Sequence, residues 1–309
     1  MDNKNKLKLR WNIIFLMIAV SSLVIRLLMH YRFDKSALLY VGIPFLIALA
    51  LMWVDRPKVD ISWKRKFGNL VLVSLVVMLG SSVILFEGFL CVVMFMPIYF
   101  GVILLVFLIK YLAEYIRNRR SRQLFSHVLP LILVFSAFEG THPQLSFDRQ
   151  NQVILSQVVH ASISEIRQQL VRPIHLQKDR DWFLEFFPMP YKVDASSLEE
   201  GDYHQLDFRY HRWFVTNTHT GNMLLKIEQS DDSIIKLRFV EDTSYIANYL
   251  KLQSSELQLV PIDGENTQVT LVVDYIRLLD PAWYFEPLQH YGISKSMEFF
   301  LAEVVTPNE

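Results

Sequence analysis

Cysteine is almost absent from this chain of 309 residues, in which Cys91 is the sole thiol. A single cysteine rules out a disulfide framework and a thiolate metal cluster. The patterns of common catalytic sites are missing as well, since there is no G-x-S-x-G, Walker loop, G-x-G-x-x-G or H-E-x-x-H. His204, His211 and His219 are spaced unlike any recognised zinc site. We therefore set aside hydrolases, kinases and Rossmann-type dehydrogenases, and we expect no metal and no cofactor.

The chain also lacks net charge, but only because two unlike halves cancel. Residues 1–140 hold 17 Lys and Arg against 7 Asp and Glu, whereas residues 141–309 hold 14 against 24. The whole is 52% hydrophobic with a mean hydropathy of +0.24, which is too apolar for one ordinary globular domain. A basic apolar half joined to an acidic polar half indicates a membrane anchor followed by a water-soluble domain. The acidic half argues against nucleic acid as a partner.

Four apolar stretches have about the 20 residues that a helix needs to cross a bilayer. They are residues 11–29, 37–54, 69–86 and 89–111. A fifth stretch, residues 124–138, is only 15 residues long and contains Pro130, so an interfacial helix competes with a true span. We expect an all-α transmembrane bundle over residues 1–140 with four or five membrane-spanning helices.

Positive charge in the short loops sets the expected orientation, because Lys and Arg are retained on the cytoplasmic side. It gathers in residues 4–10, 56–66 and 110–122. These segments are expected in the cytoplasm, with the N-terminus, in a bacterial-type inner membrane or a plasma membrane. The C-terminal domain lies outside the cytoplasm if residues 124–138 cross the membrane, and inside it if they do not.

The second half changes from helical to strand periodicity after a polar linker at residues 141–151. Residues 152–159 alternate as a strand, and Ser162 with Glu165 forms a capping box for a helix over residues 164–170. Residues 179–187 are expected to form a second short helix. Alternating strands then follow, with a long amphipathic helix at the end. The expected strands are residues 203–215, 222–229, 234–241, 249–261 and 267–279, and the final helix covers residues 283–305.

This order resembles the helix-grip fold of the SRPBCC superfamily, which contains START lipid-transfer domains, polyketide cyclases and the birch-pollen allergen type. The resemblance covers about residues 152–305. It is carried by Val153–Leu170, a strand running into a helix, and by Val272–Leu301, VVDYIRLLDPAWYFEPLQHYGISKSMEFFL, where a last strand meets the closing helix. It implies an α+β domain whose curved antiparallel sheet surrounds a long C-terminal helix. It also implies an apolar ligand class but no residue roles, and the N-terminal membrane helices depart from its commonest, wholly soluble members.

A sheet curved around one helix leaves an interior space unless side chains fill it. Aromatic residues of the strands and of the last helix are candidates to line that space, although each can equally be ordinary core. The candidates are Phe208, Tyr210, Trp213, Tyr275, Trp283 and Tyr284.

Polar residues crowd the strand at 203–215, where alternation puts Asp207, Arg209 and His211 on one face and His204, Phe208 and Tyr210 on the other. If the first face points inward, a cation and an imidazole suit an acidic ligand or acid–base catalysis. Otherwise these residues form a solvated surface.

Three functions stay open. The first is a membrane-anchored module that binds a lipid or another hydrophobic small molecule, with the bilayer and that molecule as its partners. The second is an enzyme of the cyclase or isomerase type that uses polar cavity residues. The third is a membrane sensor or assembly protein whose cavity is filled by its own side chains.

Overall fold

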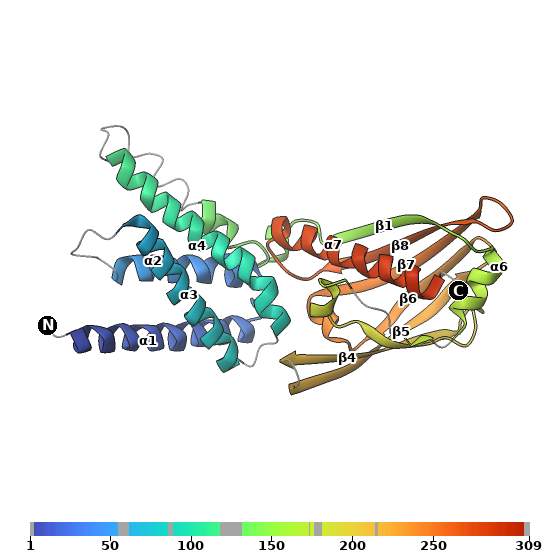
Figure 1. Cartoon of the computed structure of the whole chain (residues 1–309), viewed down its shortest axis with the longest axis horizontal. Helices are drawn as coiled ribbons and strands as arrows, with labels where there is room; N and C mark the ends of the chain where they lie inside the picture. The colour runs from blue at the N-terminus through green and yellow to red at the C-terminus, as the bar shows by residue number, and fades with distance from the viewer. Residues whose placement is uncertain are drawn as a thin grey trace. The chain divides into compact units, whose positions relative to one another are not determined.

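The computed structural model describes residues 3–54, 62–85, 89–117, 132–172, 174–175, 181–213 and 216–305 (Figure 1). The chain divides into two compact units. Unit 1 comprises residues 1–147 together with 279–284, and unit 2 comprises residues 148–278 and 285–309.

Unit 2 is built on one eight-stranded sheet with the order β1-β8-β7-β6-β5-β4-β3-β2, in which neighbouring strands are antiparallel. The first strand therefore lies beside the last, and the chain crosses from one edge of the sheet to the other between β1 and β2. The strands are β1 (Gln150–Val159), β2 (Ile174–His175), β3 (Pro190–Asp194), β4 (Tyr203–Trp213), β5 (Thr216–Ser230), β6 (Ile234–Asp242), β7 (Leu250–Pro261) and β8 (Thr267–Arg277).

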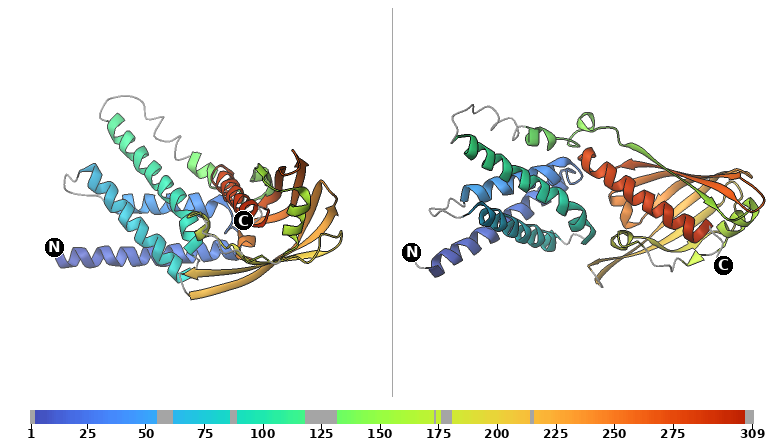
Figure 2. Two further views of the ribbon diagram at one scale, coloured as in Figure 1. Left: turned by 45° about the vertical axis from the view of Figure 1, so that its right-hand side comes forward. Right: turned by 45° about the horizontal axis from the view of Figure 1, so that its top comes forward.

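The sheet curls around the long C-terminal helix α7 (Ala282–Phe300), which a π-helical turn, Leu301–Val305, extends (Figure 2). Register shifts interrupt the ladders between β3 and β4, β5 and β6, and β7 and β8. Such bulges bend a strand and increase its twist, which allows the sheet to curve. The result is a half-barrel with one long helix on its concave side, as the helix-grip resemblance implies.

The main core lies between α7 and one side of the sheet. Ile293, Met297 and Leu301 of the helix pack against buried side chains of β1, β6, β7 and β8. Burial alternates strictly along β8, where every second residue from Thr267 to Arg277 is buried. The face of the sheet that carries these residues is called the inner face below.

A short helix, α6 (Ile163–Leu170), follows β1 and begins as the sequence predicts. The Ser162 side chain caps its first turn, and Glu165 completes the capping box, so the hydrogen bonds run in both directions. The neighbouring prediction of a helix over residues 179–187 is wrong for its described part, which holds only the 3-10 turn Leu184–Phe186. Phe183 instead packs edge-on against Tyr291 of α7 with ring centroids 4.9 Å apart. The short strand β3 that follows is absent from the predicted set.

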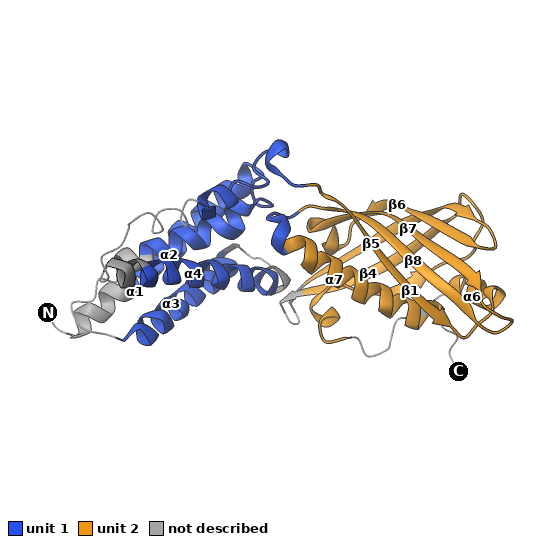
Figure 3. Ribbon diagram, turned by 90° about the horizontal axis from the view of Figure 1, so that it is seen from above, with its two compact units in different colours: residues 1–147, 279–284 blue, residues 148–278, 285–309 orange. Residues whose placement is uncertain are grey.

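Unit 1 consists of apolar helices with the segment Leu279–Tyr284 added to them (Figure 3). Three helices are long and apolar enough to cross a membrane, over Trp11–His30, Trp63–Ile84 and Val92–Leu112. The expected span at residues 37–54 is helical, but its apolar helix Leu38–Ala50 is shorter than these three. The helices are α1 (Asn3–His30), a π-helical turn (Leu38–Gly42), α2 (Ile43–Val54), α3 (Trp63–Leu85) and α4 (Phe89–Arg117). Of the expected fifth span, residues 124–131 lie outside the described residues, and residues 132–136 are helical.

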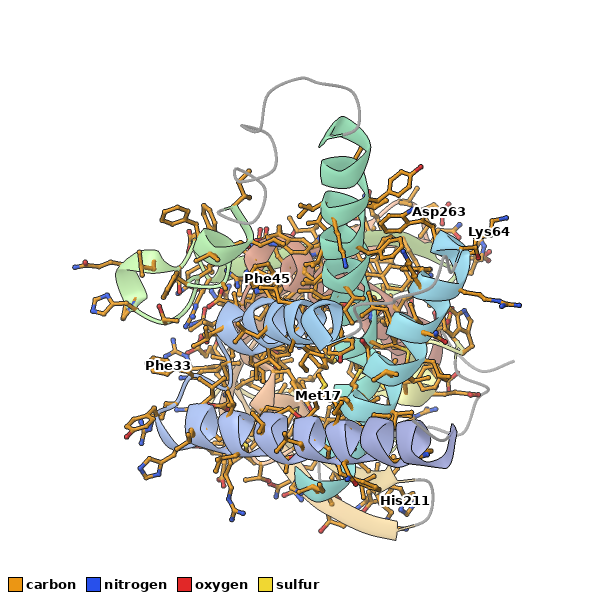
Figure 4. The ribbon with its side chains drawn as sticks, turned by 90° about the vertical axis from the view of Figure 1, so that its left-hand side faces the viewer. Met17, Phe33, Phe45, Lys64, His211 and Asp263 are labelled. Atoms are coloured by element: carbon orange, nitrogen blue, oxygen red, sulfur yellow. The ribbon has the colours of Figure 1, made fainter. Side chains whose placement is uncertain are left out.

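Individual hydrogen bonds link α3 of unit 1 to α1 and to α4. The hydroxyl oxygens of Ser21 on α1 and Ser81 on α3 lie 2.7 Å apart, and Tyr99 of α4 donates to the main-chain oxygen of Ser74 on α3 over 3.0 Å. Inter-helical hydrogen bonds of this kind contribute on the order of 1 kcal/mol or less each in a membrane. Figure 4 shows Met17 on α1, Phe45 on α2 and Lys64 at the start of α3.

The segment Leu279–Tyr284 is held in unit 1 by three hydrogen bonds. Main-chain nitrogens of Asp280 and Ala282 donate to the Lys35 main-chain oxygen (2.9 Å) and to Glu139 Oε1 (2.7 Å). The Tyr284 hydroxyl donates to the main-chain oxygen of Met94 on α4 over 2.6 Å. Residues that precede and begin α7 are therefore part of the helical unit, although strand periodicity and the closing helix surround them in the sequence.

Candidate functional site

Strand β4 places its two sets of side chains as the alternation predicts. His204, Phe208 and Tyr210 are buried, whereas Arg209 and His211 are exposed and Asp207 is partly exposed. Phe208 packs with Met223 and Leu225, which fixes the buried set on the inner face. The face that carries Asp207, Arg209 and His211 therefore points away from α7.

The three polar residues of that outer face have partners typical of a protein surface. Asp207 accepts a hydrogen bond from Gln205 over 2.7 Å, and the Arg209 guanidinium lies 5.2 Å from the centre of the Tyr191 ring. His211, near the end of β4 (Figure 4), is 2.9 Å from the Thr218 hydroxyl through Nδ1. These contacts hold the side chains outside, so they cannot meet a ligand on the inner face. Asp207, Arg209 and His211 were catalytic candidates only if their face of β4 pointed inward, and that face points outward.

The six aromatic candidates separate into three groups. Phe208, Tyr210 and Tyr275 are buried on the inner face. Trp283 is 60% exposed, and Tyr284 is bound to α4 in unit 1, so neither lines the interior of the sheet. Of Trp213 only the main chain is described, at the end of β4.

A second apolar cluster, the strand cluster, covers the part of the inner face formed by β4 and β5. Its buried members are Phe208, Met223 and Leu225. Partly buried residues from β4, β6, β7 and the turn after β6 surround them. These residues are Leu206, Leu237, Phe239, Ile246 and Leu252. Among its described members none belongs to α7, in contrast to the main core.

Sequence reasoning missed three polar side chains on or facing the inner face. Asp242 pairs in register with buried Met223, so the two side chains share that face. Tyr275 and Gln289 are 0% and 5% exposed. The Tyr275 hydroxyl, Gln289 Oε1 and Asp242 Oδ2 are buried without a hydrogen-bond partner among the described residues. A buried polar atom left in this state costs about 1–3 kcal/mol, so such atoms call for a partner beyond the described residues.

One of the three was visible as a pattern in the sequence. Phe285, Gln289, Ile293, Met297 and Leu301 recur every four residues along one stripe of the last helix, and Gln289 alone among them is polar. An apolar stripe at this spacing faces the core. Its single amide was therefore a detectable signal, whereas nothing local marks Tyr275 or Asp242.

Burial shifts the pKa of the two titratable groups among them, Tyr275 and Asp242. It raises the pKa of Tyr275 to about 12, with the negative charge of Glu286 adding to the rise and Arg277 opposing it. The Tyr275 hydroxyl therefore keeps its proton at neutral pH and is a hydrogen-bond donor rather than a base. Burial also raises the pKa of the Asp242 carboxyl above its ordinary value, against hydrogen bonds from Ser244 that lower it. Among the described residues no three His, Cys, Asp or Glu side chains gather in a way that would hold a metal ion.

The sequence matches no protein-family model and, at a significant level, no curated protein. Solved structures similar to about half of the chain include the Zhui aromatase/cyclase from Streptomyces sp. R1128, at 18% identity and a TM-score of 0.34, covering 50% of this chain and 92% of that one. A START superfamily protein from Mycobacterium smegmatis is similar at 13% identity and a TM-score of 0.33, over 50% of this chain and 96% of that one. Ginseng major latex-like protein 151 from Panax ginseng has 13% identity and a TM-score of 0.31, over 50% and 97%.

The strand order carries the assignment of the fold. The first strand pairs with the last, helical segments separate β1 from β3, consecutive strands β3 to β8 are antiparallel neighbours, and one long helix closes the concave side. This is the arrangement of helix-grip domains. The chain thus joins an N-terminal group of apolar helices, three of them long enough to cross a membrane, to a C-terminal domain with the helix-grip fold.

Proposed function

We propose that this protein is a membrane-anchored module that binds a lipid or another hydrophobic small molecule against the inner face of its helix-grip sheet. The observation that carries the proposal is the strand cluster. Its residues face inward, are apolar, and include none from α7 among the described members. An apolar ligand is the natural cover for such a surface.

The energetic gain is large enough to support binding. Removing apolar surface from water contributes about 25 cal/mol per Å². A ligand that covers about 200 Å² of the partly buried ring around Phe208 gains about 5 kcal/mol before the cost of association is subtracted. Leu206, Leu237 and Phe239 supply part of that ring.

The anchor contributes position rather than contacts to this function. Three apolar helices of spanning length precede the domain. A domain tethered to a bilayer meets membrane-dissolved ligands at an effective concentration far above that of a freely diffusing protein. Tethering therefore favours a molecule that partitions into lipid.

The enzyme interpretation required Arg209 and His211 to point into the interior, but both are exposed on the outer face. Tyr275 holds its proton too tightly to act as a base at neutral pH. The sensor or assembly interpretation predicts an inner face with no ligand, and the following experiment separates it from ligand binding.

The test uses the full chain, purified in detergent and analysed by native mass spectrometry, with any released molecule identified after solvent extraction. Leu237→Trp replaces a leucine that packs against the buried residues of the strand cluster with a much larger indole ring. Val240→Trp on the same strand is the matched control, because Val240 is exposed. We expect an apolar molecule to co-purify with the wild type and the control and to be lost from Leu237→Trp. A ligand-free wild type that also takes up no lipid from a panel would refute the proposal in favour of the sensor or assembly function.

A further inference from the structure

We propose that the ligand carries an uncharged hydroxyl group, bound by the Tyr275 hydroxyl and the Gln289 side-chain oxygen on the inner face beneath the first half of α7. This inference rests on the proposed function, because it names the polar end of the apolar molecule. It follows from two buried polar atoms that the described protein leaves without a partner.

Tyr275 lies in the interior of the sheet and not at its edge. It pairs in register with Asn151 of β1 and with Leu252 of β7, and its side chain is fully buried within the main core. Its hydroxyl oxygen is buried without a hydrogen-bond partner among the described residues. Buried hydroxyl groups are normally hydrogen-bonded, so this donor is expected to meet an acceptor that the described residues do not supply.

Gln289 presents the complementary atom. Its Nε2 donates to the main-chain oxygen of Tyr249 over 3.1 Å. A carbonyl oxygen can only accept, which fixes the orientation of the amide and leaves Oε1 as the acceptor without a partner among the described residues. The oxygen and nitrogen of a side-chain amide are often hard to tell apart, but this hydrogen bond identifies the atom without a partner as the acceptor Oε1.

The two side chains lie at the same end of the sheet. The Tyr249 oxygen that accepts from Gln289 also accepts from the main-chain nitrogen of Leu278, three residues beyond Tyr275 on the chain. Glu286, one turn before Gln289 on α7, is close enough for its charge to raise the pKa of Tyr275. Tyr275 and Gln289 thus face one region from the sheet and from the helix.

An alcohol satisfies both atoms, since its oxygen accepts from Tyr275 and its proton goes to Gln289 Oε1. An ether or ester oxygen can accept but cannot donate. A carboxylate also has no proton to give. The buried cation Arg277, next on the inner face of β8, directs its Nη2 group to the main-chain oxygen of Asp148 at 3.3 Å. The pair Tyr275 and Gln289 therefore selects a group that both accepts and donates a hydrogen bond, as a neutral hydroxyl does and a carboxylate does not.

The experiment compares three probes with the same chain length on the full protein in lipid nanodiscs, with empty nanodiscs as the blank. The probes are tritiated 1-dodecanol, dodecyl methyl ether and dodecanoate. We expect 1-dodecanol to bind about tenfold more tightly than the ether, as one buried hydrogen bond would give. Dodecanoate is expected to bind more weakly than 1-dodecanol.

Two variants assign the two bonds separately. Tyr275→Phe removes the donor and should weaken both 1-dodecanol and the ether. Gln289→Met removes the acceptor and should weaken 1-dodecanol while leaving the ether unchanged, which also shows that the variant is folded. Tyr203→Phe, at an exposed tyrosine of β4, is the matched control and should change nothing.

The outcomes separate this inference from the function on which it rests. Equal binding of all three probes, unaffected by either variant, would overturn the hydroxyl inference and leave apolar binding intact, with a water molecule as the partner of Tyr275. Tightest binding of dodecanoate would overturn it in favour of a charged head group. Failure of every probe to bind would count against the proposed function itself.

Discussion

Gly221 lies on the inner face of β5, in register with Phe208 of β4. A Cβ atom at this position would overlap the main-chain oxygen of Thr243, which cannot move aside as the end of a flexible side chain can. The backbone of the turn after β6 therefore approaches the sheet at a point where only glycine fits.

Gly221→Ala is expected to destabilise the helix-grip domain by about 1–3 kcal/mol, the usual cost of overpacking. Gly264→Ala is the matched control, because nothing lies within 4 Å of the Cβ it would add. Hydrogen–deuterium exchange of β5 and β6 in the full chain measures the difference. Equal protection in the two variants would contradict this expectation and show that the turn after β6 shifts to make room for the added methyl group.

Asp242 is a residue whose charge opposes folding at neutral pH. Burial raises its pKa in the folded protein above the unfolded value, so the folded state favours the protonated carboxyl. The resulting destabilisation is fully present above the raised pKa and disappears as the pH falls below the ordinary range of an aspartate.

Asp242→Asn is therefore expected to raise the thermal midpoint of the domain at pH 7, while keeping an oxygen that accepts from the Ser244 main-chain nitrogen. The gain should shrink as the pH is lowered through the raised pKa and vanish below the ordinary range of an aspartate. Glu241→Gln, at the exposed neighbour, serves as the control and should show no such trend. A gain that grows toward acid pH would contradict the sign argued here.

At the scale of elements, β4 shows how one strand serves two environments. Its even-numbered side chains from His204 to Tyr210 face inward, and its odd-numbered ones face outward. Phe208 is buried in the strand cluster, whereas Arg209 only stacks on Tyr191 at the surface. Adjacent residues of the strand should therefore differ greatly in their contribution to stability.

Phe208→Ala is expected to cost about 3–5 kcal/mol of unfolding free energy, because it removes a buried ring and leaves a cavity. Arg209→Ala should cost about 1 kcal/mol or less, the value of an exposed cation–π contact. Urea denaturation of the full chain in detergent compares the two. Similar losses for both would mean that the outer face of β4 is covered.

At the scale of the whole molecule, the topology predicted from the sequence makes the side of the membrane that holds the helix-grip domain depend on residues 124–138. Their content of Leu, Val, Ile and Phe favours insertion, and residues 132–136 are helical. We therefore expect five spans, with the N-terminus in the cytoplasm and the C-terminal domain outside it.

The sole cysteine makes this simple to test, since Cys91→Ala gives a thiol-free chain. Glu265→Cys in that background puts one thiol on the exposed hairpin between β7 and β8. A membrane-impermeant maleimide should label it in intact cells or spheroplasts. Asn5→Cys, beside the basic N-terminus, should label only after permeabilisation. Labelling of Glu265→Cys only after permeabilisation would instead place the domain in the cytoplasm, as four spans require.

Local patterns in the sequence determined much of the fold. The apolar runs, the capping box at Ser162, the alternation along β4 and β8 and the closing helix all depend on neighbours within a few residues, so they can be read without the fold. The prediction of a helix over residues 179–187 was wrong for its described part, because Phe183, one of the aromatic residues that suggested it, packs on Tyr291 of α7 just before a 3-10 turn.

Tertiary structure alone decided which face of each strand points inward and which polar atoms meet there. Alternation defines two faces but does not name the inner one, which depends on where α7 packs. Tyr275 and Gln289 face one region only because β8 and the start of β7 lie beneath α7. Trp283 and Tyr284 lie outside the interior because their segment belongs to unit 1, where the Tyr284 hydroxyl is hydrogen-bonded to α4. The sequence alone therefore determined the elements and their two-sided character, whereas long-range packing decided which side became the candidate site.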